Sequence, residues 1–187
     1  AWRPDVLGDA DLVEEIARVA SLANLKGVPL PKKDVGISKP VLNISQKREQ
    51  IARRSIAALG YNECVSYSFI DVRSAQLFGG GTEDTQLQNP ISTDMSHMRP
   101  DLLPGLLKAA SRNQARGFSD IALFEVGSVF GGGEPSDQDF QISGLLVGQI
   151  TKKNVHSKTR NIDIFDVKAD VEATLAALGA PKKVKIS

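Results

Sequence analysis

Four carboxylates near the start of the chain are the residues whose types and spacing most readily suggest chemistry. Asp5, Asp11, Glu14 and Glu15 lie within eleven residues of one another. The last three follow one another at helical spacing, so they share one face of a helix. Hard cations such as Mg²⁺ bind oxygen ligands of this kind, with water completing the shell. Carboxylates are also common in the first turns of helices, where the helix dipole stabilises them. The residues alone favour this second, structural interpretation.

The helix that would position these carboxylates is predicted to begin at Asp9 as N-cap and to end near Ser21. Its apolar residues recur with helical periodicity, and they are Leu12, Val13, Ile16 and Val19. We interpret residues 1–30 as the C-terminal end of a small helical module that carries the acidic cluster. Residues 31–44 are predicted to be a linker, since proline and charge interrupt any regular element there.

A second helix is predicted from Ser45, as N-cap, to Gly60. Ala52, Ile56 and Leu59 are its apolar positions, at i, i+4 and i+7, and they form its buried or interface-forming stripe. Residues 63–70 alternate between apolar and polar side chains, which favours a strand.

The stretch from Met98 to Phe130 predicts a helix, a stop and a buried strand. Pro104 suits a first helical turn, and Gly117 suits the position just after the last one. Residues 121–126 are dense in apolar side chains, as in a central strand. A separate face of this helix carries three basic residues, Lys108, Arg112 and Arg116. They are candidates for contact with nucleic-acid phosphates, although basic residues late in a helix also stabilise its dipole and keep the surface soluble.

The remaining elements complete an α+β pattern. Residues 131–135 are predicted to be a turn and residues 140–147 a strand, while residues 151–160 are polar and are expected to be a loop. Asp166 is the expected N-cap of a last helix that ends at Gly179. The order of elements predicts a mainly antiparallel sheet flanked by helices over residues 45–187.

Composition excludes several classes of protein. The net charge of +1 over 187 residues provides no overall basic field for nucleic acid. Cys64 is the single cysteine, so an internal disulfide is excluded and a reducing compartment is expected. No apolar run approaches the ~20 residues that span a bilayer, and we expect no membrane partner.

Several blocks of sequence resemble one family in collinear order. The helix start Leu-Leu-Pro-Gly-Leu-Leu and the strand Leu-Phe-Glu-Val-Gly-x-Val-Phe resemble the second signature region of class II aminoacyl-tRNA synthetases. Within this class, the motif sequence most resembles that of the beta subunits of bacterial phenylalanine–tRNA ligases. The further matching blocks are RPDVLGDADLVEEIARV (3–19), LGYNECVSYSFI (59–70), NPIS (89–92) and FDVKADVEATL (165–175).

This resemblance implies a class II synthetase-like core and an assembly of the (alpha-beta)₂ type. Such assemblies attach phenylalanine to its tRNA in the cytoplasm, with ATP used by the complex rather than bound by this fragment. The resemblance also favours the metal interpretation of the acidic cluster, because Asp5, Asp11, Glu14 and Glu15 match a Mg²⁺ site that the alpha subunit completes.

The catalytic signatures of class II synthetases are incomplete in this sequence. An arginine that pairs with the ATP α-phosphate is expected directly after Val129-Phe130, but Gly131 stands there, and Gly133 replaces the expected glutamate. A glycine offers no guanidinium for bidentate phosphate binding. The third class II motif is not found before Ser187, so we expect a core truncated at its C-terminus. We therefore predict a non-catalytic core segment, itself inactive, that supports assembly with the alpha subunit.

The resemblance further places a subunit interface on the helix of residues 45–59 and the segment that follows it. The interface residues expected from it are Ala52, Ile56, Leu59 and Tyr61. Through this helix the isolated fragment could also self-associate. Two alternatives from other classes are a stand-alone tRNA-binding domain and an ATP-using ligase of the class II type.

Overall fold

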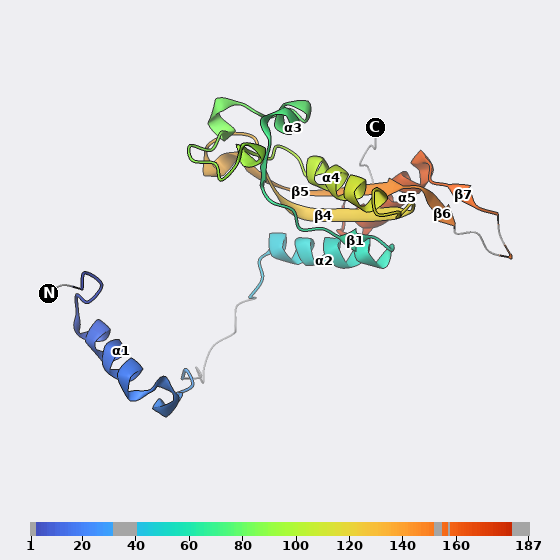
Figure 1. The fold of residues 1–187 in the computed structure, drawn as a ribbon. Helices are drawn as coiled ribbons and strands as arrows, with labels where there is room; N and C mark the ends of the chain where they lie inside the picture. Colours follow the sequence, from blue (N-terminus) through green and yellow to red (C-terminus); the bar gives the residue numbers. More distant parts are fainter. Residues whose placement is uncertain (1–2, 32–40, 152–154, 157, 181–187) are drawn as a thin grey trace. The chain divides into compact units, whose positions relative to one another are not determined.

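The computed structural model describes residues 3–31, 41–151, 155–156 and 158–180, and these belong to two units, Ala1–Pro40 and Val41–Ser187 (Figure 1). Residues 32–40 of the predicted linker lie outside the described residues. In the described part of the chain, no helix has both the length and the apolar character needed to cross a membrane.

The first unit contains the helix α1 (Asp9–Ala20), followed by the 3₁₀ turn η1 (Leu22–Asn24). The prediction of Asp9 as N-cap is wrong by one residue, since Gly8 is the N-cap. Asp11 supplies the capping carboxylate, and its Oδ2 accepts from the backbone N–H groups of Leu7 at 2.9 Å and Gly8 at 2.8 Å. A carboxylate at the third helical position can satisfy the free N–H of the cap residue, so a glycine cap is sufficient here.

The second unit holds the remaining elements. Its helices are α2 (Ile44–Ala58), α3 (Val72–Leu77), α4 (Leu103–Gln114) and α5 (Ile164–Ala177). Its strands are β1 (Asn62–Glu63), β2 (Phe69–Ile70), β3 (His97–Met98), β4 (Ile121–Phe130), β5 (Gln138–Val147), β6 (Gln149–Thr151) and β7 (Arg160–Asn161). Its short 3₁₀ turns are η2 (Glu83–Thr85), η3 (Thr93–Met95) and η4 (Pro135–Asp137).

The main sheet has the strand order β1-β4-β5. β4 and β5 pair antiparallel along their full length, from Ile121 opposite Val147 to Phe130 opposite Gln138. β1 pairs parallel to β4 over two residues only, and β2–β3 and β6–β7 form two-stranded antiparallel ribbons. The predicted α+β class with a mainly antiparallel sheet flanked by helices is therefore confirmed.

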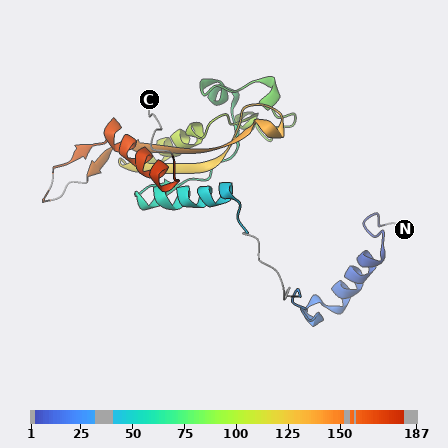
Figure 2. The same cartoon turned by 180° about the vertical axis from the view of Figure 1, so that it is seen from behind.

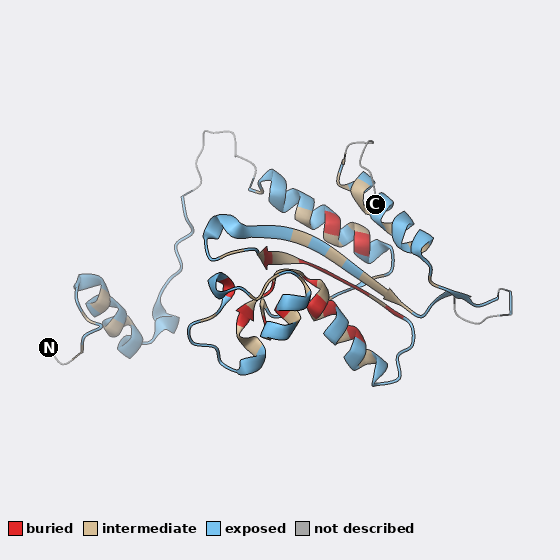
Figure 3. Cartoon of the chain, turned by 90° about the horizontal axis from the view of Figure 1, so that it is seen from above, coloured by how far each residue is buried: buried red, intermediate tan, exposed pale blue. Residues whose placement is uncertain are grey.

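Successive residues of β4 point to opposite faces of the sheet, as the period of a strand requires. Ile121 and Leu123 pack against Leu106 of α4, whereas Phe124 and Val126 pack against Ile56 of α2. Figure 1 shows α2 and α4 on opposite sides of β4 and β5, and Figure 2 shows α5 beside α2. In Figure 3 the buried residues follow β4 and the facing turns of α2 and α4. β4 is thus the centre of the core.

Three further predicted boundaries differ from the structure. Residues 63–70 do not form one strand. β1 ends at Glu63, Cys64 N–H still donates to the Phe124 carbonyl at 2.7 Å, and the chain pairs with β3 only from Phe69. Asn43 replaces Ser45 as the N-cap of α2, and it forms a reciprocal capping box with Gln46.

The last helix also begins earlier than predicted. Asp163 is the N-cap of α5, and its Oδ1 accepts from the N–H groups of Phe165 at 2.8 Å and Asp166 at 3.2 Å. The predicted cap, Asp166, is instead the third helical residue, and its Oδ2 accepts from the N–H of Asp163 at 2.9 Å. Part of the loop predicted at residues 151–160 lies outside the described residues, and its ends belong to β6 and β7.

A buried ion pair lies between β4 and α4. Arg99 Nη1 donates to Glu125 Oε1 at 2.6 Å, and the two side chains are only 6% and 3% exposed. The Ser66 hydroxyl accepts from Arg99 at 3.0 Å and donates to Glu125 Oε2 at 2.7 Å. Arg99 Nε donates to the carbonyl of Ser128 at 2.9 Å. Every charge in this network has a hydrogen-bonded partner, which buried charges require.

Because of the ion pair, we expect an alanine substitution at Gly127, beside Arg99, to cost more stability than one at Gly144 in the neighbouring strand. A Cβ at Gly127 would lie 2.7 Å from Arg99 Nη2, so we expect Gly127→Ala to lower the free energy of unfolding by about 1–3 kcal/mol. Gly144→Ala in the neighbouring strand is the matched control, because its Cβ would meet nothing closer than 3.5 Å. We expect it to change stability by less than about 0.5 kcal/mol. Urea denaturation of both variants checks this, and equal losses would contradict it.

We also expect the effects of substituting Arg99 and Glu125 on the free energy of unfolding to be non-additive. Glu125→Leu leaves a buried guanidinium without its counter-charge, so we expect a loss of about 3–5 kcal/mol in urea denaturation. The double variant Arg99→Met/Glu125→Leu removes both charges and should recover a large part of that loss. Additive effects of the two single substitutions would show that the charges are not coupled.

Candidate functional site

The acidic cluster of the first unit is held by arginines. Arg3 forms ion pairs with Asp5 and, at 2.9 Å, with Glu15, and Arg18 contacts the other Glu15 oxygen at 2.5 Å. Hydrogen bonds from Arg3 hold the pKa of Asp5 below its usual value, and those from Arg18 and Arg3 do the same for Glu15. The pKa of Asp11 is lowered by the backbone N–H groups of the helix start. These carboxylates are therefore kept ionised.

The same contacts decide whether the cluster fits a metal ion. Asp11 uses its Oδ2 as a helix cap, Glu14 is exposed, and Arg3 binds Asp5 and Glu15. Within the described residues, no three histidine, cysteine or acidic side chains form a group that could hold a metal. The four predicted ligands are thus not gathered into such a group in this chain, and Mg²⁺ binding by them stays a prediction. Arg3 is the residue that sequence reasoning missed, although its position two residues before Asp5 was a signal.

The turn between β4 and β5 contains Gly131, the position at which the ATP-binding arginine of a class II synthetase is expected from the sequence. Gly131 N–H donates to the Asp137 carbonyl at 2.9 Å, and Glu134 N–H donates to Asp137 Oδ2 at 3.2 Å. A Cβ at Gly132 would collide with the Asp137 carboxylate, and one at Gly133 would lie 3.0 Å from the Asp84 carbonyl. Hydrogen bonds within the turn therefore hold it together, and the groups around it are hydrogen-bond acceptors, namely carbonyl and carboxylate oxygens. No ion pair among the described residues brings a basic side chain to it.

The predicted nucleic-acid contacts lie along α4 and just beyond its end. Lys108 Nζ binds Asp71 Oδ2 at 2.7 Å, an ion pair that ties α4 to the start of α3. This ammonium group, together with the Ser74 N–H, holds the pKa of Asp71 well below its usual range. Arg112 and Arg116 are exposed. Contact with nucleic acid stays a prediction, and Lys108 has a structural partner within the chain.

The predicted interface residues point partly into the domain. Ala52 is 0% exposed and Ile56 is 6% exposed, whereas Leu59 is 41% exposed. Arg53 of the same helix donates to the Val126 carbonyl at 3.0 Å and to Glu63 at 2.7 Å, which fixes α2 to the sheet. An interface role for this stripe stays a prediction, and within this chain Ala52 and Ile56 are core residues.

Tyr61 contacts a residue that sequence reasoning did not connect to it. Its hydroxyl donates to Asp170 Oδ2 of α5 at 2.7 Å, across a sequence separation of 109 residues. Burial and the hydrogen bond to this carboxylate raise the pKa of the Tyr61 phenol well above its usual value. The bond therefore persists across the physiological pH range.

Comparison with known sequences identifies related proteins over the whole chain. The family model of the phenylalanyl tRNA synthetase beta chain CLM domain matches residues 30–187. A phenylalanine–tRNA ligase beta subunit from Ruegeria pomeroyi is 64% identical over 186 residues, and one from Cereibacter sphaeroides is 62% identical over 187. Each alignment covers 100% of this chain and 23% of the relative. The chain thus spans about a quarter of the length of these relatives.

Comparison with solved structures agrees on the fold. Two structures of pyrrolysyl-tRNA synthetase from Desulfitobacterium hafniense superpose with TM-scores of 0.51 and 0.50, at 14% and 15% identity. They cover 73% and 72% of this chain and 47% and 45% of the synthetase chain. At this identity the similarity concerns the fold, and it confirms the synthetase-like core. Because the beta-chain domain model matches residues 30–187, the chain belongs to the family of phenylalanine–tRNA ligase beta subunits.

Proposed function

We propose that this chain is a non-catalytic core segment of the ligase beta subunit, whose role is to support assembly with the alpha subunit. The observation that carries the proposal is the turn at residues 131–137, where an acidic, self-closed hairpin stands in place of a nucleotide-binding arginine. Family membership supports the assignment to a ligase beta subunit, and the turn supports the absence of catalysis.

The turn is unsuited to a triphosphate for electrostatic reasons. Asp137 accepts hydrogen bonds in the turn through both its backbone carbonyl and its carboxylate, and Glu134 is the N-cap of η4. Stabilising a transferring phosphate requires positive groups aimed at the developing charge. A negative carboxylate at this position would repel ATP instead, so amino-acid activation would have to occur elsewhere in the complex.

Assembly can use the outer surface of α2. Ile44 is 71% exposed and Ile51 is 42% exposed, and the two lie seven residues apart on one helix face. Apolar side chains exposed in this way are suited to burial against a second subunit. The interface that we propose therefore lies on the exposed flank of α2 that Ile44 and Ile51 share, next to the buried stripe of Ala52 and Ile56.

The remaining features of the proposal come from the family. We propose an (alpha-beta)₂ assembly in the cytoplasm that charges tRNA with phenylalanine, with ATP used by the alpha subunit. The acidic cluster would take part in a Mg²⁺ site only within that assembly, since Asp5 and Glu15 must first be released from Arg3.

The first test addresses catalysis. We expect the 187-residue chain to show no phenylalanine-dependent ATP–pyrophosphate exchange, and Gly131→Arg to remain inactive because the acidic turn persists. The complete ligase of Ruegeria pomeroyi is the positive control. Exchange by the chain alone, above that of a heat-denatured sample, would refute the non-catalytic role.

The second test addresses assembly. Co-expression with the alpha subunit of the same Ruegeria ligase should give one co-eluting species in size-exclusion chromatography. Ile51→Glu places a charge in the proposed contact, so we expect its affinity for the alpha subunit to fall at least about tenfold, or 1.4 kcal/mol. Gln50→Glu creates the same residue one position away and is the matched control. Equal affinities of the two variants would remove α2 from the interface.

A further inference from the structure

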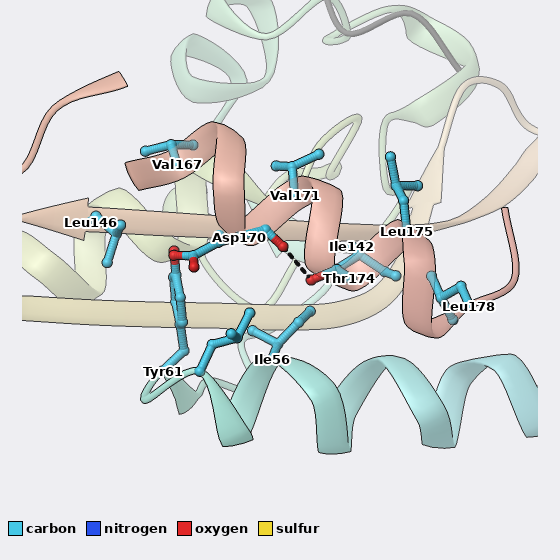
Figure 4. Close-up of a pocket in the computed structure, with 12 residues that line it drawn as sticks. Ile56, Tyr61, Ile142, Leu146, Val167, Asp170, Val171, Thr174, Leu175 and Leu178 are labelled. Atoms are coloured by element: carbon cyan, nitrogen blue, oxygen red, sulfur yellow. Dashed lines mark hydrogen bonds between the residues drawn. The ribbon is translucent and has the colours of Figure 1, made fainter. Parts of the chain in front are cut away.

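A cavity of about 220 Å³ lies under α5, between this helix, α2 and β5 (Figure 4). Its walls are mostly aliphatic, and they include Ile56, Ile142, Leu146, Val171 and Leu175. The side chains come from three elements that are far apart in the sequence. Ligand pockets in proteins are lined in this way, by apolar walls with a few polar groups that fix orientation.

The cavity exists because α5 does not pack tightly onto the sheet. None of its residues is buried, and Val167 and Val171 are 41% and 40% exposed. Gly144 of β5 offers no side chain to fill the space beneath it. On the other face of the sheet, Leu106 of α4 is fully buried. An unfilled apolar space forfeits packing contacts, so a molecule that occupies it gains them.

One charge lies in this apolar wall. Asp170 is the single ionisable carboxylate among the lining residues, and no lysine or arginine lines the cavity. Its Oδ2 accepts from Tyr61 at 2.7 Å. Within the described part of the chain, no hydrogen-bond donor contacts Oδ1. An ionised carboxylate has about four acceptor sites, so this side chain can accept further hydrogen bonds from a bound molecule.

We propose that this cavity is a binding site for a small organic cation, a primary ammonium carried on a compact aliphatic body. The alkyl part would lie against Ile142 and Leu146, and the ammonium would donate to Asp170 beside the Tyr61 hydroxyl. Charge-assisted hydrogen bonds are about twice as strong as neutral ones, and the aliphatic wall favours an apolar body. An anion of the same shape would meet the carboxylate at close range and be repelled.

The test uses hexylamine, hexanol and hexanoate as probes of equal length. Each is titrated at pH 7 into the 187-residue chain with labelled isoleucine and leucine methyl groups, and binding is followed by methyl NMR. An alkylamine is protonated at this pH, as lysine is with its pKa of about 10.4. We expect hexylamine to shift the methyl signals of Ile56, Ile142 and Leu146, with an affinity about tenfold above that of hexanol. Hexanoate should produce no shift.

Three variants locate the site. Asp170→Asn keeps an oxygen for Tyr61 but removes the charge, so the preference for hexylamine over hexanol should disappear. Glu172→Gln removes the same charge from the same helix at a side chain that is 57% exposed and outside the cavity. It should leave the preference unchanged. Val171→Phe fills the cavity from its partly exposed rim, so it should weaken both hexylamine and hexanol.

Several results would overturn the proposal. Equal binding of hexylamine and hexanol by the unmodified chain would show that Asp170 contributes no selectivity. Equal effects of Asp170→Asn and Glu172→Gln would show only a general attraction of cations to α5. The methyl signals could also remain unchanged with all three probes but shift on addition of the Ruegeria alpha subunit. In that case the cavity is a contact surface for a protein, and the small-molecule site is refuted.

Discussion

The ion pair between Arg99 and Glu125 is the constraint on which the second unit depends. It joins the segment after β1, the segment after β3 and the central strand β4, over sequence separations of 26 to 59 residues. The backbone of Arg99 adds to this, since its N–H donates to Ser68 and its carbonyl accepts from Phe130. A buried charge tolerates few alternative positions. The pair therefore specifies how these segments meet, and glycines at 105 and 127 leave room for it.

The two faces of β4 are completed differently. α4 covers one face with the fully buried Leu106, together with the ion pair. α2 and α5 share the other face, where Phe124 is fully buried beneath α2 but α5 leaves a cavity over β5. The contact between Tyr61 and Asp170 helps to hold α5 in place without close packing. The sheet around β4 thus carries a tightly packed core on the α4 side and a cavity on the α5 side.

Architecture and catalysis are physically separable in this fold. The pairing of β4 with β5 reaches Phe130 and Gln138, so the sheet is complete before the turn begins. The side chains of that turn can therefore change from phosphate-binding to acidic without loss of strand pairing. The proposed absence of a nucleotide-binding arginine at Gly131 is therefore compatible with the synthetase-like fold.

The sequence by itself determined the longer helices and strands and the family. The spacing of apolar residues and the positions of proline and glycine predicted α4, with Pro104 in its first turn, and the buried strand that follows. These features reflect interactions between residues that are close together in the chain. Cap positions were misplaced by one to three residues, since several polar side chains near each helix start can serve. Only the tertiary structure decided that Arg3 binds the acidic cluster, that Glu125 pairs with Arg99 and that Tyr61 reaches Asp170. Each of these contacts joins residues that the folded backbone brings together, and nothing in the local pattern specifies such a meeting.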